Sequence, residues 1–269
     1  MDVRVGCQFS YLAEVPTAAI VQVEPRLDQE ADLVREQWST DPVLEFHAYR
    51  DVFGNVCRRT TLPAGPTVLG YDSLVRVSGR TEDRDESAEE IPPGQLPDDV
   101  LIYTVPSRFC LPDQLATVAW NQFGGVAPGY ARVQAVCDFV HDHIRFDYGA
   151  TSPLASALDV YQARAGVCRD FAHLGITLCR ALNIPARYAF GYIPDIDVSP
   201  ADWTPMDFCA WMEVFLGGRW WTFDPRNNIP RVGRVLIGLG RDAVDVAMIT
   251  TFGGPMLTAM TVWADVEAP

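Results

Sequence analysis

Cys168 stands at a position where a thiol can become a nucleophile. In the stretch AGVCRDFAHLGITLCRAL it stands two residues after a glycine and opens a predicted helix. Unpaired N–H groups and the positive end of the helix dipole lie at such a start, and they stabilise a thiolate and lower its pKa. The same N–H groups suit the oxyanion that forms when a thiolate attacks a carbonyl carbon. These features fit a nucleophile, and equally a cysteine that is simply buried at a helix start.

A thiol nucleophile needs a base beside it, and none of the four histidines is well placed to serve Cys168. His173 lies five residues along the same predicted helix, which turns it about 140° away from the thiol. His141 and His143 end another amphipathic segment, where a cationic side chain suits the C-terminus of a helix. His47 belongs to a predicted strand near the start of the chain. The base therefore has to be sought elsewhere.

The segment 207–224 predicts a β-hairpin that turns at Gly217-Gly218, because two glycines tolerate the positive φ angles of such turns. A two-residue loop fixes the register of the hairpin. In this register Cys209 and Asp224 are diagonal neighbours on one sheet face, about 7–8 Å apart at the backbone. An imidazole at position 209 would span that distance to a carboxylate at 224, and the short side chain of cysteine does not. The hairpin thus predicts the frame of a base–carboxylate pair without the base.

These motifs, taken in order, resemble the bacterial transglutaminase-like family, whose core is papain-like. They are GVC, a strand ending in A-R-Y-x-x-G-Y, and D-F-x-A-W-x-E-V-x-x-G-G-R-W-W-x-F-D, and they span residues 166–224. The later PRNNIPRVGRVLIGLGRDAVDVA and the strands and VPSRFC segment before the core are similar to bacterial members as well. The resemblance implies that Cys168 is the nucleophile and Asp224 the orienting aspartate. The family's base histidine belongs in D-F-H-A-W, where this chain has Cys209.

By this resemblance the protein is a thiol hydrolase or acyl-transferase that acts on peptide or glutamine-type amide bonds of a peptide or protein, without a cofactor. Cysteine at position 209 alters that expectation, because a positioned base contributes roughly 10²–10⁴-fold to such rates. A neutral thiol is a poor acid at pH 7, since its reference pKa is about 8.5. We therefore expect impaired or ester-restricted turnover.

Two alternatives remain open on the sequence. In the first, the chain is a pseudoenzyme that keeps the cleft and binds a peptide or amide without turning it over. In the second, Cys168 and Cys209 close into a disulfide, which requires Cα atoms within about 7 Å. The same two thiols, with Asp224 and a water, would also make a ligand set suited to zinc.

Two tryptophans are candidates for the walls of a substrate pocket. Trp211 shares the predicted sheet face with Cys209, and Trp203 precedes the hairpin in a proline-rich loop over 194–205. Aromatic side chains at such places also serve sheet and loop packing. We expect Trp211 beside the acyl group and Trp203 at the entrance.

The surrounding elements predict an α+β fold. Residues before position 80 read as strands, while helical periodicity begins after position 110. We expect a β-rich N-terminal domain over 1–100, of which 80–99 form an acidic loop or linker, and a core domain over 101–269 with an antiparallel sheet and the nucleophile at a helix N-terminus. The expected helices are 112–123, 130–144, 156–164 and 168–183, and the expected core strands outside the hairpin are 187–192, 231–237 and 258–264.

Composition narrows the partners and the compartment. The formal net charge is −14 and all 21 basic residues are arginines, so the surface should repel nucleic acid and anionic lipid. No apolar run approaches the roughly 20 residues that cross a membrane, and the N-terminus lacks the pattern of a signal peptide. Seven cysteines without a CxxC pair fit a reducing compartment. We expect a cytoplasmic protein, and the oligomeric state is not indicated.

Overall fold

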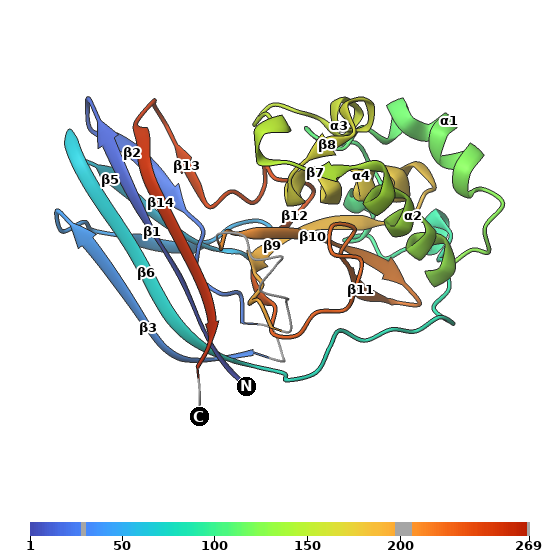
Figure 1. Cartoon of the computed structure of the whole chain (residues 1–269), viewed down its shortest axis with the longest axis horizontal. Coiled ribbons are helices and arrows are strands. Elements are labelled where there is room, and N and C mark those ends of the chain that lie inside the picture. Colours follow the sequence, from blue (N-terminus) through green and yellow to red (C-terminus); the bar gives the residue numbers. More distant parts are fainter. Residues whose placement is uncertain (28–30, 197–205, 268–269) are drawn as a thin grey trace.

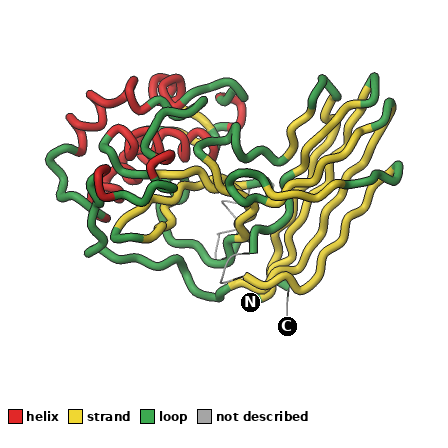
Figure 2. The backbone as a smooth tube through the Cα atoms, turned by 180° about the vertical axis from the view of Figure 1, so that it is seen from behind, coloured by secondary structure: helices red, strands yellow, loops and turns green. Residues whose placement is uncertain are grey.

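The computed structural model describes residues 1–27, 31–196 and 206–267. Within these ranges the chain forms three four-stranded antiparallel sheets, a short parallel strand pair and four α-helices. Long strands gather at one end of the molecule, and the helices gather at the other, around a smaller central sheet (Figure 1). The tube view from behind shows the same division (Figure 2). The predicted α+β class is confirmed.

Two of the sheets face each other at the strand-rich end. One has the order β14-β1-β6-β3 and the other β13-β2-β5-β4. On β1 the side chains of Val3, Val5, Cys7 and Phe9 are all buried, as expected for residues that share one face of a strand. The strand bounds are β1 Asp2–Ala13, β2 Thr17–Val21, β3 Ala31–Asp41, β4 His47–Arg50, β5 Val56–Leu62, β6 Gly65–Val77, β13 Ile249–Thr251 and β14 Met256–Val266.

The last two strands correct the expected domain boundary. β14 pairs along the whole of β1, from Val3 opposite Val266 to Leu12 opposite Met256, and β13 pairs with β2. Residues 249–266 therefore belong to the N-terminal sheets and not to the core domain of 101–269. The two ends of the chain lie close together as a result (Figure 1). Periodicity predicts that such a segment is a strand, but it does not say which strand it will pair with.

The helices begin and end almost where the sequence predicts. They are α1 Pro112–Phe123, α2 Tyr130–His143, α3 Ala157–Ala163 and α4 Cys168–Ala181. Ser156 caps α3 by accepting from the N–H of Asp159. Short 3-10 turns lie at Pro93–Gln95, Leu101–Tyr103 and Tyr148–Ala150, and the parallel pair joins β7 Arg145–Phe146 to β8 Ala165–Gly166.

The core sheet has the order β11-β10-β9-β12. Its central hairpin joins β10 Cys209–Leu216 to β11 Arg219–Phe223, and Leu216 lies opposite Arg219 as the two-residue loop requires. Both Gly217 and Gly218 have positive φ angles, 58° and 86°. The remaining strands are β9 Ala186–Tyr192 and β12 Val235–Gly240. β12 begins later than the predicted strand at 231.

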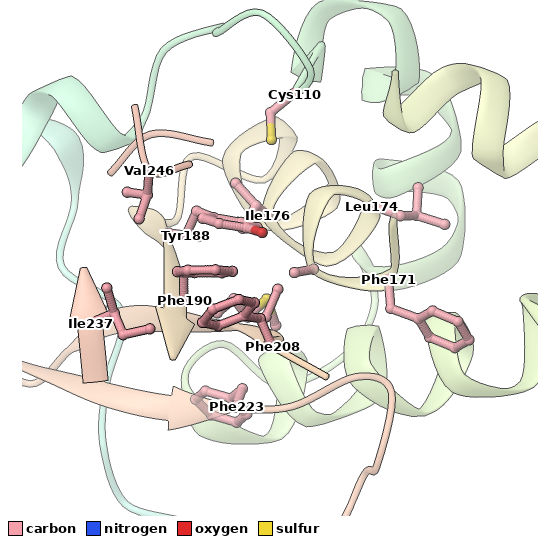
Figure 3. Close-up of a cluster of buried hydrophobic side chains, with 14 of the residues drawn as sticks. Cys110, Phe171, Leu174, Ile176, Tyr188, Phe190, Phe208, Phe223, Ile237 and Val246 are labelled. Carbon is pink, nitrogen blue, oxygen red and sulfur yellow. The ribbon is translucent and has the colours of Figure 1, made fainter. Parts of the chain in front are cut away.

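Helix α4 is the centre of the core. Every residue from Asp170 to Ala181 is buried, because α1, α2 and α3 cover it on several sides and β9 and β10 pack against it. Figure 3 shows its apolar side chains among those of the sheet, with Ile176 near Tyr188 and Phe190. The hydrophobic core continues into the N-terminal sheets, where the rings of Phe9 and Phe208 stack at 6.2 Å.

The acidic segment 80–99 is irregular apart from one 3-10 turn, but it is bound to the core. Glu90 accepts hydrogen bonds from Arg132 and from the N–H of Gly129, both at 2.9 Å. Glu82 accepts from the side chain of Arg234 and from the N–H of Arg231. Two carboxylates of this segment thus bind cationic or N–H groups of the core, which a solvated linker would not do.

Gly191 on β9 lies where the sheet leaves no room for a side chain. A Cβ atom there would be 2.1 Å from the carbonyl oxygen of Val235 and 2.9 Å from the ring of Trp211. We expect Gly191→Ala to lower the free energy of unfolding by about 1–3 kcal/mol, the usual cost of overpacking. Chemical denaturation measures it. Gly94→Ala is the matched control, because no atom lies within 4 Å of its added Cβ, and an equal loss in both variants would contradict the argument.

Candidate active site

A cavity of about 960 Å³ opens where α4 and β10 begin. Cys168 and Cys209 both line it, so the structure brings two of the predicted site residues to one space. Asp224 and Trp211 do not lie on its wall. The lining residues are His141, Ile144, Phe146, Tyr148, Thr151, Val167, Cys168, Phe171, Ile193, Asp195, Met206, Asp207, Phe208, Cys209, Arg226, Asn227 and Arg231.

The start of α4 is held in place by Asp170. Its Oδ2 atom accepts from the N–H of Val167 at 2.9 Å and from the hydroxyl of Thr151 at 2.6 Å. Gly166 makes this possible, since a Cβ atom there would lie 2.6 Å from the carboxylate of Asp170. The glycine before Cys168 is therefore required by close packing, and the buried carboxylate fixes the position at which the helix and the thiol begin.

Cys168 is half-buried, and its Sγ lies 3.8 Å from the carbonyl oxygen of Phe208. Burial raises the pKa of this thiol, and the Arg226 guanidinium and the N–H of Ala210 lower it only in part. Burial thus opposes the lowered pKa that the helix start predicts. Desolvation of the sulfur outweighs the groups that favour its charge.

Cys209 is buried beside it, with its Sγ 3.7 Å from the carbonyl oxygen of Asp207 and 3.9 Å from Nη1 of Arg226. Burial, with the neighbouring Cys168 thiol, raises the pKa of Cys209 to about 12. At neutral pH this residue is a neutral thiol and a very weak acid. All seven cysteines are free in the structure, so the two thiols share the site without a disulfide.

Asp224 lies behind the cavity wall with its hydrogen-bonding capacity fully used. Its Oδ1 accepts from the N–H groups of Arg226 and Asn227, and its Oδ2 accepts from the Asn227 side chain and from Arg234, both at 2.7 Å. Burial alone raises the pKa of Asp224, but Arg234 and Asn227 hold it below its usual value. Asp224 is therefore ionised at neutral pH, and it has no proton to give to a leaving group.

Arg234 occupies the space beside Asp224 from the far side. It binds Glu82 as well as Asp224, and its guanidinium lies over the ring of Trp211, 4.9 Å from the centroid. Trp211 is 2% exposed and packs with Cys209 under this arginine. The predicted place of Trp211 in the pocket wall is thus not what the structure shows. Trp203 lies outside the described residues.

Among the described residues, no group of three or more His, Cys, Asp or Glu side chains converges to hold a metal ion. The triad suggested for zinc has its carboxylate turned to Arg234 and Asn227 and away from the two thiols. The donor set Cys168, Cys209 and Asp224 therefore does not fit a metal centre. None of the described helices is long and apolar enough to cross a membrane.

Comparison with known proteins places this geometry in a family. The model of the transglutaminase-like superfamily matches residues 116–225. A crystal structure from Cytophaga hutchinsonii, described provisionally as that of a cysteine protease, superposes with a TM-score of 0.91 at 32% sequence identity, over 100% of this chain and 92% of that one. The chain belongs to the transglutaminase-like superfamily.

Two mycobacterial relatives have no described activity. An uncharacterized protein of Mycobacterium leprae is 28% identical over 258 residues, which are 91% of this chain and 90% of that protein. An uncharacterized protein of Mycobacterium tuberculosis is 31% identical over 116 residues, which are 40% of this chain and 37% of that protein. For this transglutaminase-like chain the chemistry must therefore be argued from its own site.

The histidines of this superfamily member are accounted for by other contacts. His173 is fully buried, stacks between Phe109 and Tyr188, and accepts from the N–H of Ala243 at 3.2 Å; burial keeps its pKa far below the usual value. Nε2 of His143 contacts the carbonyl of Tyr161. His141 does reach the cavity, with Nδ1 at 2.9 Å from the carbonyl oxygen of Arg226. The sequence interpretation of His141 as a cation at the end of a helix did not predict this position.

Sequence reasoning also missed the charged residues of the cavity, chiefly Arg226 and Asp207. Arg226 follows Asp224 by two positions, in a turn whose direction no periodicity reveals. Its guanidinium lies 4.1 Å from the ring centroid of Phe146 and faces both thiols. Asp207 precedes β10, and burial raises its pKa. The one available signal was the cation two residues after the family aspartate.

The electrostatics of Cys168 give a pH prediction. Because its pKa is raised above the ordinary value of 9.0, the thiolate forms only above that pH, and alkylation by iodoacetamide should accelerate with a midpoint beyond pH 9. Arg226→Gln removes a cation that favours the thiolate, so the midpoint should move further up. Mass-mapped alkylation rates between pH 6 and 11 measure both. A midpoint near pH 6–7 would show instead that the helix start dominates.

Proposed function

We propose that this protein is a thiol-dependent acyl-transfer enzyme of the transglutaminase-like superfamily, with Cys168 as the nucleophile and with low turnover on amides. The observation that carries the proposal is the placement of Cys168, half-buried at the start of α4 on the wall of a cavity of about 960 Å³ that Arg226 and Cys209 also line. The attacked bond belongs to a peptide or protein acyl donor. Cys168 forms a thioester and releases the leaving group, and water or an amine then takes the acyl group.

Arg226 supplies one half of what a histidine would do. An imidazolium next to a thiolate stabilises the negative charge by attraction, and the Arg226 guanidinium acts on Cys168 in the same way. A guanidinium keeps its proton at any ordinary pH, however, so it neither removes the thiol proton nor donates one to a leaving amine. The site therefore favours the thiolate in part and lacks the proton carrier.

The neighbouring groups do not fill that gap. His141 lines the same cavity, but its Nδ1 contacts the carbonyl oxygen of Arg226, and no hydrogen bond joins its side chain to Cys168. Cys209, with a pKa of about 12, holds its proton too tightly to give it up at neutral pH. Asp224 is ionised and fully hydrogen-bonded. Asp207 is the one carboxyl group on the cavity whose pKa is raised. A leaving amine must be protonated and a phenolate or thiolate need not be, so esters and thioesters should react faster than amides.

Restoring the base should raise amide turnover selectively. We expect Cys209→His to increase release of p-nitroaniline from peptide anilides, or of ammonia from glutamine peptides, by at least about 10²-fold, the low end of what a positioned base contributes. The low end applies because Asp224 is held by Arg234 and does not orient the new imidazole. Hydrolysis of p-nitrophenyl esters should rise much less, since p-nitrophenolate leaves without a proton.

The controls for this variant separate base chemistry from general effects. Cys209→Ser removes the thiol without adding a base, and it should leave the amide-to-ester rate ratio unchanged. Cys168→Ala in the Cys209→His background should abolish both reactions. The proposal fails if Cys209→His leaves the amide rate unchanged on every substrate while folding normally by thermal denaturation and circular dichroism.

A binding function without turnover is the second candidate, and the engagement of Asp224 favours it. That carboxylate, the orienting group in the family, is bound by Arg234 and Asn227 and is not on the cavity wall. Calorimetric titration with the peptides used above distinguishes the two. Saturable binding with no acyl-enzyme mass adduct after prolonged incubation with activated esters supports the pseudoenzyme, and any adduct on Cys168 supports the enzyme.

The proposed compartment is the cytoplasm. Its support is the set of seven unpaired cysteines, most of them buried, which suits a reducing environment. The net charge of −14 disfavours nucleic acid and anionic membranes as partners.

A further inference from the structure

Arg226 is a cation in the cavity with donors to spare. Its side chain contacts the Phe146 ring at 4.1 Å and the Cys209 sulfur at 3.9 Å, and no carboxylate of the described residues forms an ion pair with it. By contrast the other arginine on the wall, Arg231, is bound to the carbonyl of Pro194 and to Asp195. A sulfur atom is a weak acceptor, so most of the guanidinium's five N–H donors have no strong partner among the residues that the structure describes.

The backbone that carries this side chain is fixed on both sides. The N–H of Arg226 donates to Asp224, and its carbonyl oxygen contacts Nδ1 of His141 at 2.9 Å. Stacking on Phe146 then orients the plane of the side chain. The contact with Phe146 restricts the guanidinium before a ligand arrives, so binding a carboxylate costs less conformational entropy than it would with an unrestrained arginine.

We propose that Arg226 makes the cavity selective for acyl donors that carry a carboxylate close to the reacting carbonyl, such as a glutaryl or aspartyl group. This specificity rests on the proposed function, because it assumes that Cys168 is the reacting atom. The carboxylate takes the place opposite the guanidinium, and the carbonyl carbon is brought to the Cys168 sulfur on the same wall. Paired charge-assisted hydrogen bonds to a carboxylate are the interaction that this fork provides best.

Asp207 limits this selectivity because its carboxylate competes with that of the acyl donor for Arg226. It lies on the same cavity and its charge interacts with that of Arg226. Burial raises the pKa of Asp207, which lessens its negative charge and its competition for the guanidinium. The rest of the molecule acts against an anion, since the net charge is −14. A preference for an anionic reagent at Cys168 must therefore come from the cavity itself.

Iodoacetate and iodoacetamide test the proposal without any need for turnover. The two reagents have nearly the same size and alkylate the same thiolate, but only iodoacetate carries a carboxylate. Arg226→Gln lowers the thiolate fraction equally for both, so that effect cancels in the ratio of their rates. We expect the iodoacetate-to-iodoacetamide ratio at Cys168, mapped by mass spectrometry, to exceed that of free cysteine and to fall about tenfold or more in Arg226→Gln.

Three further variants make the result specific. Arg219→Gln removes the same charge from an exposed position paired with Asp83, and it should leave the ratio unchanged. Arg226→Lys keeps the charge without the fork and should give an intermediate ratio. Cys168→Ser identifies background labelling. The ratio of the burst amplitude with p-nitrophenyl hydrogen glutarate to that with its neutral methyl ester should rank the variants in the same order.

The possible failures are distinguishable. If neither reagent labels Cys168 up to pH 10, the thiol is not the reacting group and the proposed function is wrong. If both reagents label Cys168 but the ratio stays at or below that of free cysteine and is the same in Arg226→Gln, the nucleophile stands and the carboxylate selectivity is overturned.

Discussion

The buried ion pair of Asp224 and Arg234 is the constraint on which the chemistry of this site depends. A carboxylate that is taken out of water must be neutralised and hydrogen-bonded, and Asp224 meets both needs with Arg234, Asn227 and one further backbone N–H. Glu82, from the acidic segment, binds Arg234 as well and holds it beside Asp224. The aspartate is thereby satisfied without any partner at position 209. A cysteine there leaves no unpaired charge behind, which explains how the fold tolerates it.

In this site the two roles of a base histidine, attraction for the thiolate and transfer of a proton, are not performed by any one group. Attraction for the thiolate comes from Arg226, while the proton stays on Cys209, whose pKa is about 12. Burial works against the thiolate throughout, because the sulfur of Cys168 lies under β10 and against apolar neighbours. A thiol in this setting reacts best with acyl groups whose leaving group departs as an anion. Amide turnover is therefore limited by proton transfer to the leaving group, because position 209 lacks the residue that would carry the proton.

The sequence was sufficient for the local parts of this structure. The bounds predicted for α1 from helical periodicity match the structure to the residue, and the two glycines of the hairpin fixed its register. These features depend on neighbours a few positions apart. The return of β14 to β1 was not predictable in this way, because partner choice between strands is settled by packing over more than 200 residues of chain.

The site was predictable only in part for the same reason. The motifs brought Cys168 and Cys209 to one cavity, since each is fixed by its own helix or strand. The partners of Asp224 were not foreseen, because Arg234 follows it by ten positions and Glu82 comes from a segment that reads as a solvated linker. Long arginine side chains reach across elements, and spacing along the chain does not reveal where their charges end. The cavity's own cation, Arg226, was missed on these grounds.

Much of the family motif has a packing reason that is independent of catalysis. Gly166 must be small for Asp170, and Gly191 must be small for Trp211 and β12. Trp211 itself is buried under Arg234 and does not reach the cavity. An intact motif around position 209 is therefore what folding alone would preserve, and it says little about turnover. The groups that folding does not explain are the thiol of Cys168 on the cavity wall and the guanidinium of Arg226, which has no carboxylate partner among the described residues. A function, whether catalytic or only binding, is best sought at these two.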